Sequence, residues 1–399
     1  MVSAFDASRP ADVRTPGDLP VEAWLVALAG LPHMGPARLL ALSLLFEPRA
    51  AWAAVLERRI LDQAELVERM GADPEAVARA WQQAATRTDV AGRWSAHAGV
   101  VVAGHRRSGY PSILSNDLEP PAVVFMLGDE RVLDRPRVAV VGTRRCTRYG
   151  HELAQQVGNE LAAAGVGVVS GLALGIDGAA HRGALEASGG GGAPPIAVVA
   201  SGLDVVYPKR HRALWERVAE TGLLLSESPL GVQPAAWRFP ARNRIIAALA
   251  DAVVVVESGE RGGSMYTVDQ ALRRDLPVMA FPGPVRSPAS AGTNKLIFEG
   301  AAIVRDSADI LGGLGVVVPP GRPRTTPHVP DGEKGRVVRA LGWEPTSLDE
   351  LVVRSSVDLP RLSVVLAELE ADGWVTRTGM WFERTSRPHR SGGVRRGAS

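Results

Sequence analysis

The sequence predicts an α/β protein built on a doubly wound parallel sheet, and three observations favour this fold class. Runs of small and β-branched apolar residues recur through the middle of the 399-residue chain. They end abruptly at glycine turns: Val138–Val141 ends at Gly142, and Val166–Val169 ends at Ser170-Gly171. Apolar residues at helical spacing follow each turn. Such repetition is typical of parallel βαβ units, whose ligands bind at the carboxyl ends of the strands.

The composition of the chain limits the kinds of protein that it could be. With 46% hydrophobic and 22% charged residues, the chain has the make-up of a globular protein of two or three domains. Its net charge is only +2, so a polyanion would have to bind a local patch. The single cysteine, Cys146, excludes a disulfide framework and a cysteine-rich metal site, and indicates a reducing cytosol. No apolar h-region begins the sequence, and no apolar run reaches the length of a membrane span.

The N-terminal part is predicted to be helical. After a loose leader over residues 1–20, helical spacing runs through a domain at 21–90, broken by the turn Gly30–Pro36. A turn of the form hydrophobic-Pro-x-x-Gly resembles that of a helix-hairpin-helix or SAM-like domain, which can present backbone N–H groups to a phosphate. The alternative, which we favour, is a small helical bundle used for packing or partner contact, with His33 a turn residue.

The central domain is expected at 95–315. Two strands, Gly99–Ala103 and Ala122–Leu127, lead into it, and continuous apolar strands indicate a sheet covered on both faces. Right-handed crossovers then predict an extended Rossmann-like domain. The further strands are expected at Val138–Gly142, Val166–Ser170, Ile196–Ala200, Leu223–Ser226, Ala252–Glu257, Val278–Phe281 and Ala302–Val304, and the helices at Tyr149–Ala164, Asp177–Ser188, Arg212–Glu220, Ala241–Leu249, Ser264–Arg274 and Thr293–Glu299.

A smaller C-terminal domain follows a Gly/Pro-rich linker at 316–332. Three amphipathic helices and a hairpin over 333–384 predict a winged helix, and a basic tail at 385–399 is expected to be disordered. The winged helix carries nine acidic and seven basic residues, and its expected recognition helix has Glu368, Glu370 and Asp372 against Arg361. Because phosphate contacts dominate affinity for DNA, this composition favours a protein-contact or regulatory role.

Basic and glycine-rich segments gather at the expected strand ends. Arginine's planar fork suits a phosphodiester, glycine turns at helix starts can hold phosphate oxygens, and aromatics among arginines suit single-stranded nucleic acid. The alternatives are a surface ion pair, a solvated or capped helix start, and a loop with buried aromatics. The segments are Gly142-Thr143-Arg144-Arg145 with Arg148, Ser201–Asp204 with Tyr207–His211, Trp237–Arg244, and Glu257–Thr267 with its turn Gly262-Gly263-Ser264.

Asp177 and His181, one helical turn apart, could form a metal or acid–base pair. No third ligand has a recognisable spacing, so we favour a helix cap for Asp177 and a packing role for His181. No nucleophile beside a base, Walker lysine or metal cluster is recognisable. The chain is therefore expected to bind a ligand without catalysis, metal or cofactor.

Taken together, these motifs resemble those of the DNA-processing protein A (DprA/Smf) family. Between Val138 and Ala301 the matching segments are VAVVGTR, SGLALGIDGAAH, SGLDVVYP, FPARNRIIA, VVVVESGERGGS, FPGP and GTNKLIFEGA, in the order of the family. Departures include Thr143 for a usual serine, Leu174 for an arginine and His211 for an asparagine.

The resemblance implies a cytosolic bacterial protein, not an enzyme, that binds and protects single-stranded DNA. It also implies self-dimerisation through the Rossmann-like fold and loading of the RecA recombinase during natural transformation or recombination. The implied DNA contacts are Gly142, Arg144, Lys209, Phe239, Asn243, Arg244, Gly263 and Ser264; Thr143, Arg145 and Arg242, from the same motifs, complete the predicted set.

Two other functions remain open from the sequence. Related folds host hydrolases of nucleotide derivatives, so an enzyme or sensor for a small nucleotide is the alternative. Of the PGGxGT-E signature of such enzymes, only Pro282-Gly283 remains. A winged-helix transcription regulator is a third interpretation, which the acidic helix disfavours.

Overall fold

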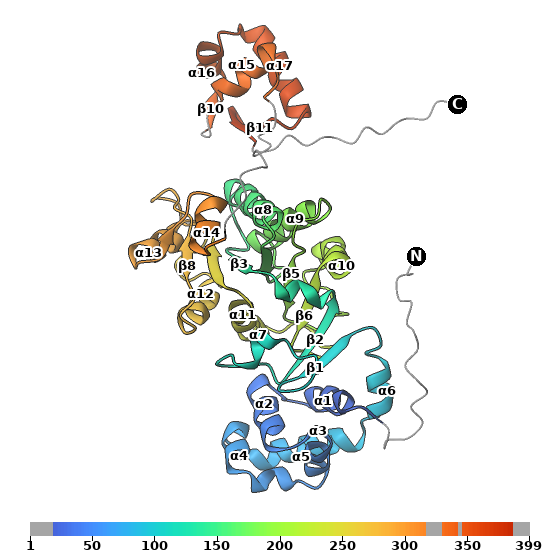
Figure 1. Ribbon diagram of the computed structural model, residues 1–399. Coiled ribbons are helices and arrows are strands. Elements are labelled where there is room, and N and C mark those ends of the chain that lie inside the picture. The colour runs from blue at the N-terminus through green and yellow to red at the C-terminus, as the bar shows by residue number, and fades with distance from the viewer. Residues whose placement is uncertain (1–18, 317–328, 342–344, 386–399) are drawn as a thin grey trace, which may run out of the picture. The chain divides into compact units, whose positions relative to one another are not determined.

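The structure, a computed structural model, describes residues 19–316, 329–341 and 345–385, and the chain divides into two compact units, residues 1–318 and 319–399 (Figure 1). Of the expected leader at 1–20, linker at 316–332 and basic tail at 385–399, the parts 1–18, 317–328 and 386–399 lie outside the described residues.

The first unit begins with the helical module. Proline occupies the first turn of α2, α3 and α5, where its missing N–H costs nothing. The module is joined to the sheet by one hydrophobic cluster, in which Trp24 and Leu25 pack with Phe125 and Leu224. Its helices are α1 (Val21–Ala29), α2 (Pro36–Leu45), α3 (Pro48–Leu56), the 3-10 turn η2 (Arg59–Asp62), α4 (Ala64–Met70), α5 (Pro74–Thr86) and α6 (Val90–Ser95).

Within the described residues, nine strands form one sheet in the order β1-β2-β6-β5-β4-β3-β7-β8-β9. The strands from β6 to β9 in this order run parallel, whereas β1 and β2 extend the β6 edge in antiparallel fashion. The strands are β1 (Val101–Gly104), β2 (Val123–Gly128), β3 (Arg137–Val141), β4 (Gly167–Ser170), β5 (Ile196–Val199), β6 (Leu223–Ser226), β7 (Ala252–Val255), β8 (Val278–Ala280) and β9 (Ala302–Ile303). The predicted doubly wound parallel sheet is confirmed.

Helices cover both faces of this sheet (Figure 1). On β3, Val138 and Val140 pack toward α8, α9 and α14, while Ala139 and Val141 pack toward α11, α12 and α13. Both faces are therefore apolar, which is why the strands read as continuous hydrophobic runs. The helices are α7 (Ser112–Ser115), α8 (Arg148–Ala163), α9 (Ile176–Ser188), α10 (Arg212–Thr221), α11 (Arg238–Ala248), α12 (Met265–Leu272), α13 (Ala291–Phe298) and α14 (Ser307–Gly313), with 3-10 turns η3 (Glu130–Asp134) and η4 (Lys209–His211).

The chain reverses its direction of travel across the sheet at β3. It builds β4 and β5 on one side, reaches β6, and then crosses back to lay β7 on the other side of β3. Loops after adjacent strands β3 and β7 consequently leave in opposite directions. Such a switch point opens a crevice at the carboxyl edge of the sheet, where ligands of this fold class bind.

The second unit has its own core, in which Val337, Leu351, Leu366 and Phe382 are buried together. Three helices precede a hairpin, and β10 joins that hairpin in the strand order β10-β12-β11. This arrangement confirms the predicted winged helix. Its elements are α15 (Gly332–Ala340), β10 (Thr346–Ser347), α16 (Leu348–Ser355), α17 (Leu359–Ala371), β11 (Val375–Thr378) and β12 (Trp381–Arg384).

Among the described helices, none is long and apolar enough by itself to cross a membrane; only α2 and α3 taken together, bent by 105° at their junction, satisfy length and composition.

Candidate functional site

The protein's own carboxylate closes the switch-point crevice. Thr147 caps α8 by accepting a hydrogen bond from the Gly150 N–H (3.0 Å), and it also donates to Glu257, which follows β7. Its N–H lies 2.8 Å from Glu257 Oε2 and its hydroxyl 2.5 Å from Oε1. Glu257 is buried. The helix N-terminus that would hold a nucleotide phosphate in this fold class is therefore already neutralised by an internal anion.

Glycines permit this closure. A Cβ on Gly150 would lie 2.3 Å from the Glu257 carboxyl carbon, and one on Gly142 would lie 2.6 Å from the Glu257 carbonyl oxygen. Gly142 is thus a packing glycine beneath the loop, and Thr143 joins it there by donating its N–H to the Glu257 carbonyl (2.7 Å). The loop itself leads outward to Arg144 and Arg145, both exposed.

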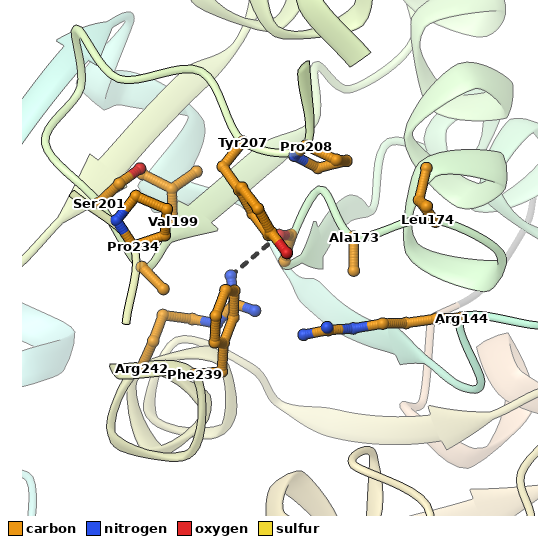
Figure 2. Close-up of a pocket in the computed structure, with 12 residues that line it drawn as sticks. Arg144, Ala173, Leu174, Val199, Ser201, Tyr207, Pro208, Pro234, Phe239 and Arg242 are labelled. Carbon is orange, nitrogen blue, oxygen red and sulfur yellow. Dashed lines mark hydrogen bonds between the residues drawn. The ribbon is translucent and has the colours of Figure 1, made fainter. Parts of the chain in front are cut away.

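A second cleft, displaced toward β4 and β5, remains open at the same edge. It encloses about 410 Å³, part of it open to solvent, and the loops after β3, β4 and β5 meet α11 around it. Figure 2 shows Arg144 reaching across this cleft toward Phe239, with Tyr207 pointing toward Phe239 from the loop above. We call this the Arg144 cleft; it is lined by Arg144, Gly171, Ala173, Leu174, Val199, Ala200, Ser201, Tyr207, Pro208, Pro234, Phe239 and Arg242.

One cation and two aromatic rings converge inside the Arg144 cleft. The Arg144 guanidinium carbon lies 4.8 Å from the centre of the Phe239 ring, within cation–π range. The Tyr207 and Phe239 rings are 5.4 Å apart and inclined by 50°. Tyr207 is 41% exposed, so its ring is available to a ligand. Flat faces and a positive charge at one place suit a ligand that has both planar groups and negative charge.

Arg242 forms the floor of the cleft. Its Nη1 donates to the Gly171 carbonyl (2.9 Å; dashed line in Figure 2) and to the Val198 carbonyl, so it ties β4 and β5 together. Burial lowers the pKa of the Arg242 guanidinium to about 10, and it remains charged at neutral pH. A Cβ on Gly171 would come within 2.4 Å of Arg242 Nη2, so any larger residue there would displace the guanidinium from the floor. Arg242 Nε also donates to Asn243 Oδ1 (3.1 Å), so Arg242 adds positive potential to the cleft while its hydrogen bonds go to the protein itself.

Arg244 is directed away from the Arg144 cleft. It forms an ion pair of 2.6 Å with Glu227, and the two side chains are only 10% and 12% exposed. Burial raises the pKa of Glu227, opposed by the charge of Arg244. Each of these buried charges depends on the other, because removal of one would leave the other unpaired in the protein interior, where a lone charge is strongly unfavourable. A direct ligand contact by Arg244 stays a prediction, for which the guanidinium would have to leave this pair.

The remaining predicted residues occupy the rim and neighbouring loops. Lys209, in η4, is exposed, whereas Ser264 is buried with its hydroxyl 2.8 Å from that of Ser258. Asn243 donates to the Gly263 carbonyl (3.3 Å) and so holds the loop after β7 against α11. Of the predicted set, the cleft lining therefore contains Arg144, Phe239 and Arg242. Tyr207 lines the cleft but is not among the predicted DNA contacts, although the sequence places the segment Tyr207–His211 at a strand end.

Asp177 and His181 support the cleft from within. The predicted cap by Asp177 is wrong, because α9 begins at Ile176 after Gly175 and Asp177 instead accepts a hydrogen bond from the Gly171 N–H (3.2 Å). His181 is fully buried, with Nε2 3.2 Å from the Ile196 carbonyl oxygen. Among the residues that the structure describes, no cluster of His, Cys, Asp or Glu side chains could hold a metal ion.

Comparison with known proteins gives consistent matches. The family model described as DNA recombination-mediator protein A matches residues 101–315, and a DprA winged helix domain matches residues 320–379. Protein Smf of Escherichia coli is 36% identical over 286 residues, covering 70% of this chain and 75% of that protein. The putative DNA processing protein DprA of Mycobacterium tuberculosis is 42% identical over 269 residues, covering 65% and 68%.

A solved structure is similar as well. The crystal structure of DNA processing protein A from Streptococcus pneumoniae is 31% identical, with a TM-score of 0.61 over 74% of this chain and 98% of that one.

The buried histidine gives a test of its scaffolding role. Burial lowers the pKa of His181 from 6.5 to about 3, so below pH 6.5 the unfolded chain binds a proton that the folded protein does not. The free energy of unfolding should therefore fall as pH falls from about 6.5 toward 3. In His181→Gln this fall should be shallower by up to about 1.4 kcal/mol per pH unit, measured by urea denaturation at several pH values. Identical slopes in the two proteins would contradict this placement of the imidazole.

Proposed function

The chain belongs to the DNA recombination-mediator protein A (DprA/Smf) family, and from this premise we propose that it binds single-stranded DNA in the Arg144 cleft. The observation that carries the proposal is the meeting of Arg144, Phe239 and Tyr207 in an open cleft. Unpaired bases expose faces that stack on aromatic rings, and their phosphates attract arginine, whereas the bases of a duplex are stacked on one another and covered. Arg145 and Lys209 are exposed and follow the lining residues Arg144 and Pro208 in the chain, and we propose that they add positive charge at the edge of the cleft.

The charge distribution of the winged helix supports the proposal that DNA binds to the first unit. Lys334 Nζ lies 2.9 Å from Asp372 and 3.2 Å from Glu368, and Arg361 pairs with Glu333 at 2.7 Å. These cations are neutralised by neighbours, which leaves them poorly placed to collect phosphates. We therefore propose that DNA is held by the first unit and that the winged helix serves protein contact or regulation.

A small nucleotide is a less suitable ligand. In this fold class a pyrophosphate binds at the helix N-terminus that corresponds to that of α8. Here the Glu257 carboxylate occupies this place, so a phosphate would meet a buried negative charge. The proposed function is accordingly binding without catalysis, and the enzyme or sensor for a nucleotide remains the second candidate only through its fold class.

Beyond binding, we propose that the protein protects single-stranded DNA in the cytoplasm and delivers it to the RecA recombinase, in natural transformation or in recombination. Support comes from the description of the matching family, a recombination mediator, and from relatives named as DNA processing proteins. A mediator must bind the strand without consuming it, which agrees with a cleft that offers stacking and charge.

We also propose that the protein forms a homodimer through its Rossmann-like domain. At the β9 edge, three apolar side chains are exposed: Val285 (88%), Phe298 (91%) and Ile303 (56%). Among the described strands, β9 pairs only with β8, so its outer edge has unpaired backbone groups. A second copy related by two-fold symmetry would cover the same patch on both subunits.

Single-stranded binding is tested with oligonucleotides of one sequence in single- and double-stranded form. The single strand should bind more tightly, and Arg144→Ala should weaken it about tenfold for every sequence and reduce the salt slope by about one. Fluorescence anisotropy across a salt series measures both quantities. Arg135→Ala, an exposed arginine that precedes β3 at the other edge of the sheet, is the matched control and should bind like wild type. Equal affinity for duplex, or unchanged binding by Arg144→Ala, would refute the site.

Delivery to RecA is tested on DNA already coated with a single-strand binding protein. Wild-type protein should shorten the lag before RecA begins DNA-dependent ATP hydrolysis, and Arg144→Ala should not, because delivery requires the protein to hold the strand. A lag that wild-type protein leaves unchanged would refute the mediator role while leaving DNA binding intact.

Dimer formation is tested by placing a charge in the apolar patch. Phe298→Arg should shift the mass measured by light scattering from dimer to monomer, because a buried unpaired charge at the interface is strongly unfavourable. Leu118→Arg, the same kind of change at a leucine that is 61% exposed in the β1–β2 connection, should remain dimeric. A monomeric wild type, or a dimeric Phe298→Arg, would contradict this interface.

A further inference from the structure

A second groove opens beside the Arg144 cleft, between the helical module and α11. It contains about 530 Å³ of space, part of it open to solvent. One wall is the turn between α1 and α2, through Met34, Gly35 and Pro36, and the opposite wall is the first part of α11, through Trp237 and Arg238. We call it the module groove. It shares Val199, Ala200 and Arg242 with the lining of the Arg144 cleft, so the two hollows are adjacent.

The α11 wall of the module groove has the chemistry of the Arg144 cleft. Trp237 is 49% exposed, and the Arg238 guanidinium carbon lies 4.3 Å from the centre of its ring. Arg238 is anchored by a hydrogen bond of 3.0 Å to the Ser228 hydroxyl. The carboxylate that lines the groove, Glu227, is neutralised by its ion pair with Arg244. The groove therefore presents an aromatic face and a cation with no unpaired anion from its lining.

The opposite wall is held rigidly by the module. The Trp81 indole donates to the Pro32 carbonyl (2.8 Å), and Arg38 Nη1 donates to the His33 carbonyl (2.8 Å). Gly35 precedes α2 with φ of −92°, and nothing lies within 4 Å of a Cβ built on it. The turn is thus a fixed surface that could accept a side chain at Gly35 without displacing anything.

We propose that the module groove extends the DNA track: nucleotides that follow those in the Arg144 cleft lie between Trp237 and the α1–α2 turn, which makes the helical module one wall of the binding site. This inference rests on the proposed function, because the groove receives the strand from the cleft. The occupant is the same strand, since the two hollows share three lining residues and both combine an aromatic face with arginine.

The test varies only the charge at Gly35. Gly35→Glu, Gly35→Gln and Gly35→Lys are compared on oligothymidylates from about 4 to about 20 nucleotides long, which span the site sizes of single-strand binders. The shortest strands, held by the cleft alone, should bind all three variants alike. For longer strands the Glu variant should bind about fivefold more weakly than the Gln variant at low salt, and the Lys variant at least as tightly as Gln. The helix dipole favours Glu and disfavours Lys at this position, so loss of folding would give the opposite order.

Substitutions of Trp237 test the module groove independently of Gly35. Trp237→Ala should lose about tenfold in affinity for the longer strands, the size of one stacked base, while Trp237→Phe should retain most of it because a ring remains. Both should keep wild-type affinity for the shortest strands. Curves for Gly35→Glu and Gly35→Gln that coincide at every length would overturn the proposal, as would equal losses in the two Trp237 variants. Failure of wild-type protein to bind strands of any length would instead refute the proposed function itself.

Discussion

A buried carboxylate determines where this fold can bind a ligand. Glu257 follows β7, and its carboxylate lies at the N-terminus of α8, where it accepts hydrogen bonds from both the backbone N–H and the hydroxyl of Thr147. Charge-assisted bonds of this kind are about twice as strong as neutral ones, and burial of Glu257 keeps water from competing with them. The position that anchors a pyrophosphate in dinucleotide-binding proteins is thereby filled. The open space lies one strand further along, where Arg144 faces Phe239.

Arg242 fixes the shape of the Arg144 cleft. It joins the carbonyls at the ends of β4 and β5 from beneath, and the Asp177 carboxylate binds the Gly171 N–H from the neighbouring helix. The cleft is therefore built from loops that are fixed by buried charged groups, which would be costly to leave unpaired. Side chains that reach a ligand from such loops need little reorganisation on binding, so less of the binding free energy is lost to ordering.

The sequence predicted most of the architecture because the strands are buried on both faces and the helices show clear apolar periodicity. Seven of the expected strands and their helices follow β1 and β2 with ends that agree within a few residues, and the winged helix was predicted in the same way. The site was harder to predict. The string Arg242-Asn243-Arg244 looks like a basic patch, but its helix turns Arg242 beneath the cleft and Arg244 toward Glu227. The sequence marks Tyr207 and Glu257 as lying at strand ends, but their contacts with Phe239 and Thr147 depend on which loops meet at the sheet edge.

The central claim is that the loops around the Arg144 cleft and the adjoining module groove hold single-stranded DNA. Hydrogen–deuterium exchange of the full chain, with and without an oligothymidylate, tests this claim most directly. Protection is predicted in residues 142–146, 171–175, 200–210 and 233–243 and at the α1–α2 turn, with α15, α16 and α17 unchanged. Protection confined to the winged helix, with the cleft loops exchanging as in the unbound protein, would contradict the account.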